Sequence, residues 1–145
     1  EANSQMDFDL DLAVQQTAQN PVYYVQYAHA RICSILKALS AERILPRRCT
    51  PEELTQLSSP EERELIRHLA AYTGEIISAA KDYDPARITR YVITLANLFH
   101  KFYNSCRVKG EEESLMQARL QLCLAVRTVI RNVLTMFKIT APENM

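Results

Sequence analysis

The stretch NPVYYVQYAHAR, residues 20–31, begins with asparagine and proline, a pair that is typical of a helix start. The asparagine side chain can accept hydrogen bonds from free N–H groups of the first turn, and proline has no N–H to leave unpaired there. Apolar residues then recur at helical spacing, which predicts a buried face made of Val22, Val25, Ile32 and Leu36. His29 lies in that face. Although Cys33 follows one turn later, we expect a packed, hydrogen-bonded histidine, because nothing nearby completes a zinc site.

The same pairing of a capping residue with proline recurs along the chain, at Thr50-Pro51, Ser59-Pro60 and Asp84-Pro85. Two of these starts also carry a glutamate at the spacing of a capping box. Strand-like alternation is limited to MDFDL, residues 6–10, which is too short to assign. The predicted helices span 10–18, 21–40, 60–82, 85–109 and 112–137, with a short turn near 51–57. The expected fold is therefore all-α, an antiparallel helical bundle.

Composition limits the kind of protein this is. The 145 residues hold 17 basic and 17 acidic side chains, but four of the acids lie in the first twenty residues, which contain no base. The remainder carries 17 basic against 13 acidic residues, a weak indication of a polyanionic partner. No apolar run approaches the ~18–20 residues of a membrane span. The four cysteines form no C-x-x-C pair, and no basic signal segment is visible, so we expect reduced thiols and a cytoplasmic location.

The helix over 21–40 has a second organised face, because Tyr24, Tyr27 and Arg31 fall together opposite the apolar stripe. These tyrosines could pack other helices with their hydroxyls at the rim, or they could offer aromatic surface to a ligand. Near the chain end, Arg127, Arg131 and Lys138 form a strip that is either a solvated helix face or a phosphate track. Neither alternative is decided by spacing alone.

No catalytic constellation is recognisable. The alternating carboxylates of residues 7–11 have no histidine or lysine beside them, and the chain has only two glycines, too few for a phosphate-cradling loop. The motifs of P-loop proteins, serine hydrolases and zinc proteases do not occur. The residues therefore predict a protein that binds something rather than one that transforms it.

The string Tyr-Val-Gln-Tyr-Ala-His-Ala-Arg, residues 24–31, resembles the signature helix that begins the anticodon-binding domain of the arginyl-tRNA synthetase (arginine–tRNA ligase) family. MDFDLDLA before it, YNSCRV and QARLQLCLAVRTVIRNVL after it, and the ending KITAPENM are similar to further segments of that family, in the same order. The resemblance covers residues 6–145. The Asp-Ala-Leu-Arg string after which the DALR domain type is named does not occur literally, and Asn144 stands where arginine is common.

The resemblance implies that residues 1–19 end the catalytic domain or link it to the bundle, and that residues 20–145 form the anticodon-binding domain. The family attaches arginine to its tRNA using ATP and magnesium, through motifs that are not found here. We therefore expect an excised C-terminal portion that holds no cofactor and is inactive alone. Its implied partners are the anticodon loop of arginine tRNA and the enzyme's own catalytic domain, with neither DNA nor a membrane involved.

The resemblance also implies the site. Anticodon bases, chiefly a middle cytosine, would be bound by Tyr24, Tyr27, Tyr103 and Met145. Aromatic faces stack on unpaired bases of single-stranded RNA. On charge and position, the candidates for phosphate contacts are Arg31, Arg47, Arg48, Arg127, Arg131 and Lys138. Two alternatives stay open: a helical protein-interaction module, and the related domain of another aminoacyl-tRNA synthetase.

Overall fold

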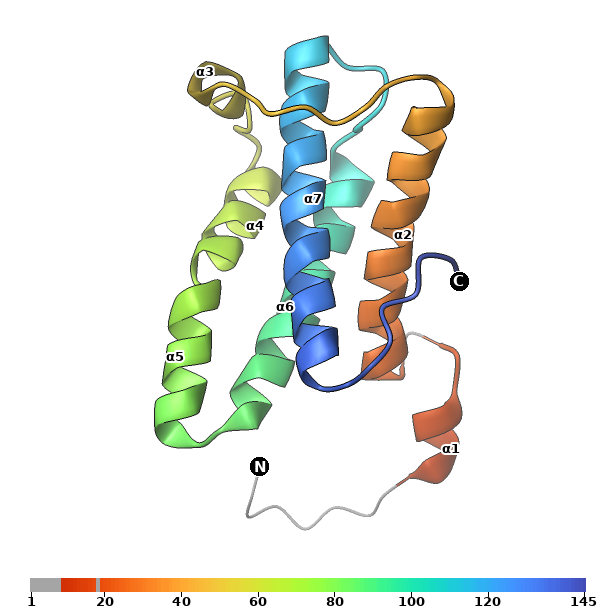
Figure 1. Ribbon diagram of the computed structural model, residues 1–145, viewed down its shortest axis with the longest axis vertical. Helices are drawn as coiled ribbons and strands as arrows, with labels where there is room; N and C mark the ends of the chain where they lie inside the picture. The colour runs from red at the N-terminus through yellow and green to blue at the C-terminus, as the bar shows by residue number, and fades with distance from the viewer. Residues whose placement is uncertain (1–8, 18) are drawn as a thin grey trace.

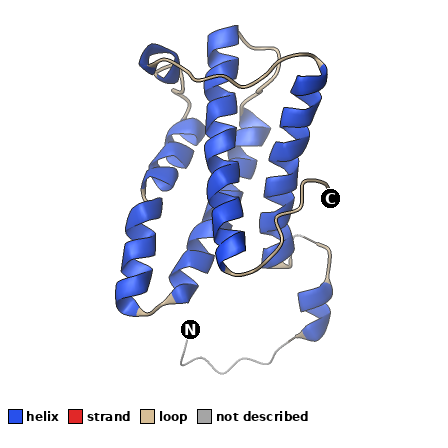
Figure 2. Cartoon of the chain, viewed as in Figure 1, coloured by secondary structure: helices blue, strands red, loops and turns tan. Residues whose placement is uncertain are grey.

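The computed structural model describes residues 9–17 and 19–145, and within them the chain is helical without a strand (Figure 2). This confirms the predicted all-α fold. The helices are α1 (Leu10–Val14), α2 (Pro21–Ala41), α3 (Pro51–Leu54), α4 (Pro60–Ala70), α5 (Tyr72–Asp82), α6 (Pro85–Ser105) and α7 (Glu113–Met136).

The long helices alternate in direction, so that α2 and α6 run one way while α4, α5 and α7 run the other (Figure 1). Helix α6 packs against α2, α4, α5 and α7. The short α1 lies at one end of the bundle, and the 42–50 connection crosses the opposite end (Figure 1). The two ends of α2 therefore face different surroundings, with α1 near its start and the basic connection at its end.

The helix starts form as their capping residues predict. The Asn20 side chain accepts a hydrogen bond from the Val22 N–H at 3.0 Å, which begins α2. Both predicted capping boxes are present, at Thr50 for α3 and at Ser59 for α4. In the second box the Glu62 side chain accepts from the Ser59 N–H at 2.8 Å, and it remains buried.

The prediction of one continuous helix over 60–82 is wrong, because the helix is interrupted at Ala71. The N–H of Ala71 bonds to the His68 carbonyl, and the Tyr91 hydroxyl donates to the same carbonyl at 3.0 Å. The His68 ring in turn donates to the Tyr91 carbonyl at 3.0 Å and stacks on the Tyr91 ring, with centroids 4.3 Å apart. A side chain inserted at a helix carbonyl is a known cause of such breaks.

Other boundaries differ by a few residues. The predicted 10–18 helix covers only Leu10–Val14, and the 51–57 turn contains a helix only over Pro51–Leu54. The 85–109 helix ends at Ser105, since Cys106 takes up extended backbone geometry. Most of MDFDL lies outside the described residues. The assignment of residues 1–19 to a neighbouring domain stays a prediction.

The core is a single apolar cluster in which α6 and α7 contribute most of the fully buried side chains. Of the predicted α2 stripe, Val25 and Ile32 are buried, whereas Val22 is 43% exposed because it lies in the first turn. All four cysteines are free thiols. Among the described residues no helix is long and apolar enough to cross a membrane, and no cluster of potential metal ligands occurs.

One ion pair lies inside this core. The Arg119 guanidinium donates from Nε to the Glu62 carboxylate at 2.7 Å, and the Glu62 side chain is only 1% exposed. Arg119 Nη1 also donates to the Arg107 carbonyl at 2.5 Å and lies 3.3 Å from Glu111. Arg119 thus joins α7 to α4 and to the connection between α6 and α7.

Candidate nucleic-acid interface

An aromatic surface lies where α2 and α6 run side by side. The ring centroid of His100 is 4.9 Å from that of Tyr24 and 5.7 Å from that of Tyr27. All three side chains are partly exposed and line a depression of about 350 Å³ whose other wall includes Gln16 and Tyr23. A shallow, largely apolar depression of this size can accept a flat aromatic group such as a nucleobase.

Arg31 continues this surface one turn further along α2. Its guanidinium carbon lies 4.8 Å from the ring centroid of Tyr103 and 5.9 Å from that of Tyr27. The Tyr103 ring stacks in turn on buried Phe99, with centroids 6.1 Å apart. The tyrosine face of α2 therefore meets the aromatic edge of α6, and a cation sits over their junction.

His100 is part of this surface, although it is not among the site residues predicted from the sequence. Burial lowers the pKa of its imidazole, and the nearby charge of Arg31 lowers it further, so the ring is neutral at neutral pH. Its Nε2 is buried without a hydrogen-bond partner among the described residues. The ring therefore serves as a flat, uncharged support for the two tyrosines. Its spacing of three residues from Tyr103 was the signal that could have identified it.

Burial also raises the pKa of the Tyr24 hydroxyl above its ordinary value of 10.0. The phenol is therefore protonated at any physiological pH and can both donate and accept a hydrogen bond. Tyr24 can thus combine stacking with polar contact to a ligand.

A second depression, of about 520 Å³, continues along the same pair of helices beyond Tyr103. Arg31 and Arg107 line it, and neither forms an ion pair with a described residue. Lys109 also lines it but is paired with Glu42. We call this whole surface the α2/α6 groove; it is formed by Tyr24, Tyr27, Arg31, His100, Tyr103 and Arg107. Arg31 lies over the rings of Tyr27 and Tyr103, and Arg107 lies beyond them at the end of the groove.

Met145 lies apart from the three tyrosines. It lines a different depression, of about 550 Å³, with Val22, Tyr23 and Gln26 on α2. Tyr23 borders both this depression and the one beside Tyr24, so the two are neighbours across the start of α2. The structure thus brings Tyr24, Tyr27 and Tyr103 together and places Met145 on the adjoining face.

The remaining predicted cations are not gathered here. Arg47 forms a two-pronged ion pair with Glu53, at 2.9 and 2.5 Å, which raises its pKa and lowers that of Glu53 to about 2. Arg47 and exposed Arg48 lie in the connection beyond the far end of α2, and Tyr27 precedes that end by fourteen residues, about 21 Å of helix.

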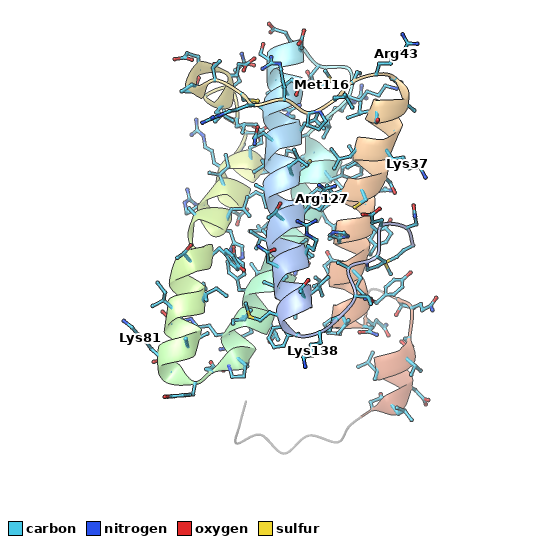
Figure 3. The ribbon with its side chains drawn as sticks, viewed as in Figure 1. Lys37, Arg43, Lys81, Met116, Arg127 and Lys138 are labelled. Atoms are coloured by element: carbon cyan, nitrogen blue, oxygen red, sulfur yellow. The ribbon has the colours of Figure 1, made fainter. Side chains whose placement is uncertain are left out.

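Arg127 lies midway along α7, as Figure 3 shows, and Arg131 follows one turn later. The helix ends at Met136, so Lys138 does not continue the expected strip; its φ of 57° turns the chain away (Figure 3). Arg127, Arg131 and Lys138 all belong to α7 or the turn after it, and none of them lines the α2/α6 groove.

Comparison with known proteins gives a consistent result. Residues 25–145 match the family described as DALR anticodon binding domain. The chain is 54% identical over 144 residues to the arginine–tRNA ligase of Ruminiclostridium cellulolyticum and 55% identical over 143 residues to that of Caldanaerobacter subterraneus. These alignments cover 99% of the chain but only 26% and 25% of the two relatives. The chain therefore spans about a quarter of their length.

The fold is also similar to that of a solved structure, the arginyl-tRNA synthetase of Thermus thermophilus. The TM-score is 0.82 at 29% identity, and the similarity covers 98% of this chain and 24% of that one. The likeness extends through the whole helical bundle, including the segments that form the α2/α6 groove.

Proposed function

The chain belongs to the DALR anticodon binding domain family, and on this basis we propose that its α2/α6 groove binds the anticodon loop of a tRNA. The single observation that carries the proposal is the cluster of Tyr24, Tyr27 and Tyr103 with Arg31 above it. Unpaired bases of single-stranded RNA stack on aromatic faces, and phosphates pair with arginine. The α2/α6 groove presents aromatic faces and arginine side chains next to one another.

Sequence and fold similarity to arginine–tRNA ligases supports a finer proposal. The chain would serve as the anticodon-reading part of such a ligase, with arginine tRNA as its RNA and the middle cytosine of the anticodon as the base chiefly read. The rest of that enzyme would hold ATP and magnesium and attach the arginine in the cytoplasm. The 145 residues would bind RNA without charging it.

Stacking alone does not distinguish one base from another, so discrimination requires polar groups at the aromatic surface. The Tyr24 hydroxyl is one candidate, because it belongs to a stacking ring and the residue is partly exposed. Arg31 and Arg107 would hold the adjoining phosphates, which fixes the loop but carries no sequence information. Arg107 replaces paired Arg47 as the better candidate for a phosphate contact.

The test is a fluorescence titration with an arginine-tRNA anticodon stem-loop and a second loop whose middle cytosine is changed to uracil. We expect Tyr27→Ala to weaken binding of the cytosine loop by roughly five- to 150-fold, because one stacked base contributes about 1–3 kcal/mol. Tyr83→Ala is the matched control, since Tyr83 is 92% exposed in the turn after α5. Equal binding by Tyr27→Ala and wild type would refute the assignment of the groove.

Salt dependence separates RNA binding from the protein-interaction alternative. Binding to RNA weakens linearly with the logarithm of salt concentration, because phosphate contacts release counterions. We expect Arg107→Gln to reduce that slope by about 0.7, the value of one single-strand phosphate contact, whereas Arg48→Gln leaves it unchanged. Salt-insensitive binding, or an equal effect of both changes, would count against the groove as a phosphate site.

A further inference from the structure

The segment after α7 does not hang free from the bundle. The Ile139 N–H bonds to the Leu134 carbonyl at 2.8 Å and the Lys138 N–H to the Thr135 carbonyl at 3.0 Å. This pattern, with Lys138 left-handed at φ 57°, is a Schellman ending that reverses the chain. Residues 139–145 then run back along α2, as the dark blue tail in Figure 1 shows. We call these residues the C-terminal tail.

Two side chains of α2 hold the tail. Gln26 Nε2 donates to the Thr140 carbonyl at 2.9 Å. One turn later, His29 Nδ1 lies 2.8 Å from the Pro142 carbonyl oxygen. Because a carbonyl can only accept, Nδ1 carries the imidazole proton in this contact. Ile139 and Ala141 between these points pack against the core.

The His29 contact is the protected one of the two. His29 is 2% exposed, and its Nε2 is buried without a hydrogen-bond partner among the described residues. The hydrogen bond of Gln26, in contrast, lies at the surface. A buried polar side chain that makes one hydrogen bond to a distant segment strongly restricts where that segment can lie. His29 therefore fixes Pro142, three residues before Met145.

The held tail builds one wall of the depression next to the α2/α6 groove. Pro142 and Met145 line this depression from the tail, Val22, Tyr23 and Gln26 line it from α2, and the rest of the lining comes from residues 13–16 and Asn20. Gln26 thus both holds the tail and lines the depression. Met145 is 49% exposed, so its thioether can contact a ligand. The position of that thioether depends on where the tail is held.

We propose that His29 is a positioning residue that latches the C-terminal tail to α2 and so presents Met145 beside Tyr23 to the bound RNA. The proposal rests on the proposed function, because the ligand is the same anticodon loop. His29 itself does not touch the RNA and acts only through the tail. Loss of the latch should therefore remove the contribution of Met145 and no other.

A double-mutant cycle tests this with the same stem-loop titration. His29→Leu keeps a buried side chain of similar size but removes the donor, and Met145→Ala removes the presented side chain. We expect each single change to weaken binding by a similar factor, roughly three- to tenfold, and the double variant to bind no more weakly than Met145→Ala. Penalties that multiply, or wild-type binding by His29→Leu, would overturn the proposal. His29→Asn should restore binding, since its Nδ2 can donate where Nδ1 does.

A second readout does not depend on RNA. With ¹³C-methyl-labelled methionine, the Met145 signal is assigned by its loss in Met145→Ala. We expect His29→Leu to narrow this signal and shift it toward the value of a free peptide, while buried Met116 stays unchanged. An unaltered Met145 signal would refute the latch. The Met145 signal could change in His29→Leu while Tyr27→Ala leaves RNA binding intact. In that case the proposed function is refuted, but the attachment of the tail by His29 is supported.

Discussion

The buried ion pair between Glu62 and Arg119 offers a sharp test of what holds the bundle together. Replacing Glu62 by glutamine keeps the shape and an acceptor oxygen but removes the negative charge. Arg119 would then be left with Glu111, whose side chain is 36% exposed, and with the Arg107 carbonyl. The arginine is itself only 9% exposed, so water can replace little of what is lost.

The magnitude follows from these contacts. Removing one partner of a buried ion pair typically costs about 3–5 kcal/mol, because the other charge stays desolvated. The residual contacts of Arg119 reduce this, and we expect Glu62→Gln to lower the free energy of unfolding by about 2–4 kcal/mol, out of the ~5–15 kcal/mol typical of a domain. The double replacement Glu62→Leu/Arg119→Met should cost less than the single change, since it leaves no unpaired charge.

Urea unfolding followed by helical circular dichroism at pH 7 measures these values. Glu64→Gln is the matched control, because Glu64 lies on the same helix and is exposed, and we expect a change within about 0.5 kcal/mol. A loss below 1 kcal/mol for Glu62→Gln, or a double variant less stable than the single one, would refute the reasoning.

Two further predictions concern stability. Burial opposes ionisation of Glu62, but hydrogen bonds from Arg119 and Ser59 outweigh it and lower the pKa of Glu62 below its ordinary 4.5. The Glu62 carboxylate therefore contributes fully to the free energy of unfolding above pH 4.5, and this contribution is lost as the pH falls through the lower pKa of the folded state. The difference in free energy of unfolding between wild type and Glu62→Gln should accordingly shrink toward pH 3. A difference that stays constant with pH would contradict this. Tyr83→Gly should raise the free energy of unfolding by about 0.5–1 kcal/mol, because Tyr83 has φ 52° and an exposed side chain; a lower urea midpoint than that of Tyr83→Ala would contradict this.

The features that could be predicted from the sequence are those whose causes are local. A capping side chain and a proline act within one turn, so the starts of α2, α4 and α6 lie where these residues predict. The ends depend on distant partners. At the break before Ala71, the hydroxyl of Tyr91 bonds to the carbonyl of His68, 23 residues away in the sequence. No pattern within the 60–82 segment contains that information.

The candidate site divides in the same way. Tyr24, Tyr27 and Arg31 share a face because helical spacing dictates it. Their meeting with Tyr103 and His100 requires α2 and α6 to lie side by side, which only the folded bundle determines. The position of Met145 depends on the reversal of the chain after α7 and on contacts across more than a hundred residues. Resemblance could name Tyr103 and Met145 but not His100, and the arrangement of all three comes from tertiary packing.

The break at Ala71 has a consequence for how the domain opens. Helix α5 packs mainly against α6, whereas α4 also contacts α7. Because the ladder of backbone hydrogen bonds is interrupted between them, α5 can separate from α6 without unwinding α4. Its amides should therefore exchange with solvent in a cooperative unit of their own, at lower cost than those of α2 and α7. The α2/α6 groove would keep its shape while α5 opens locally.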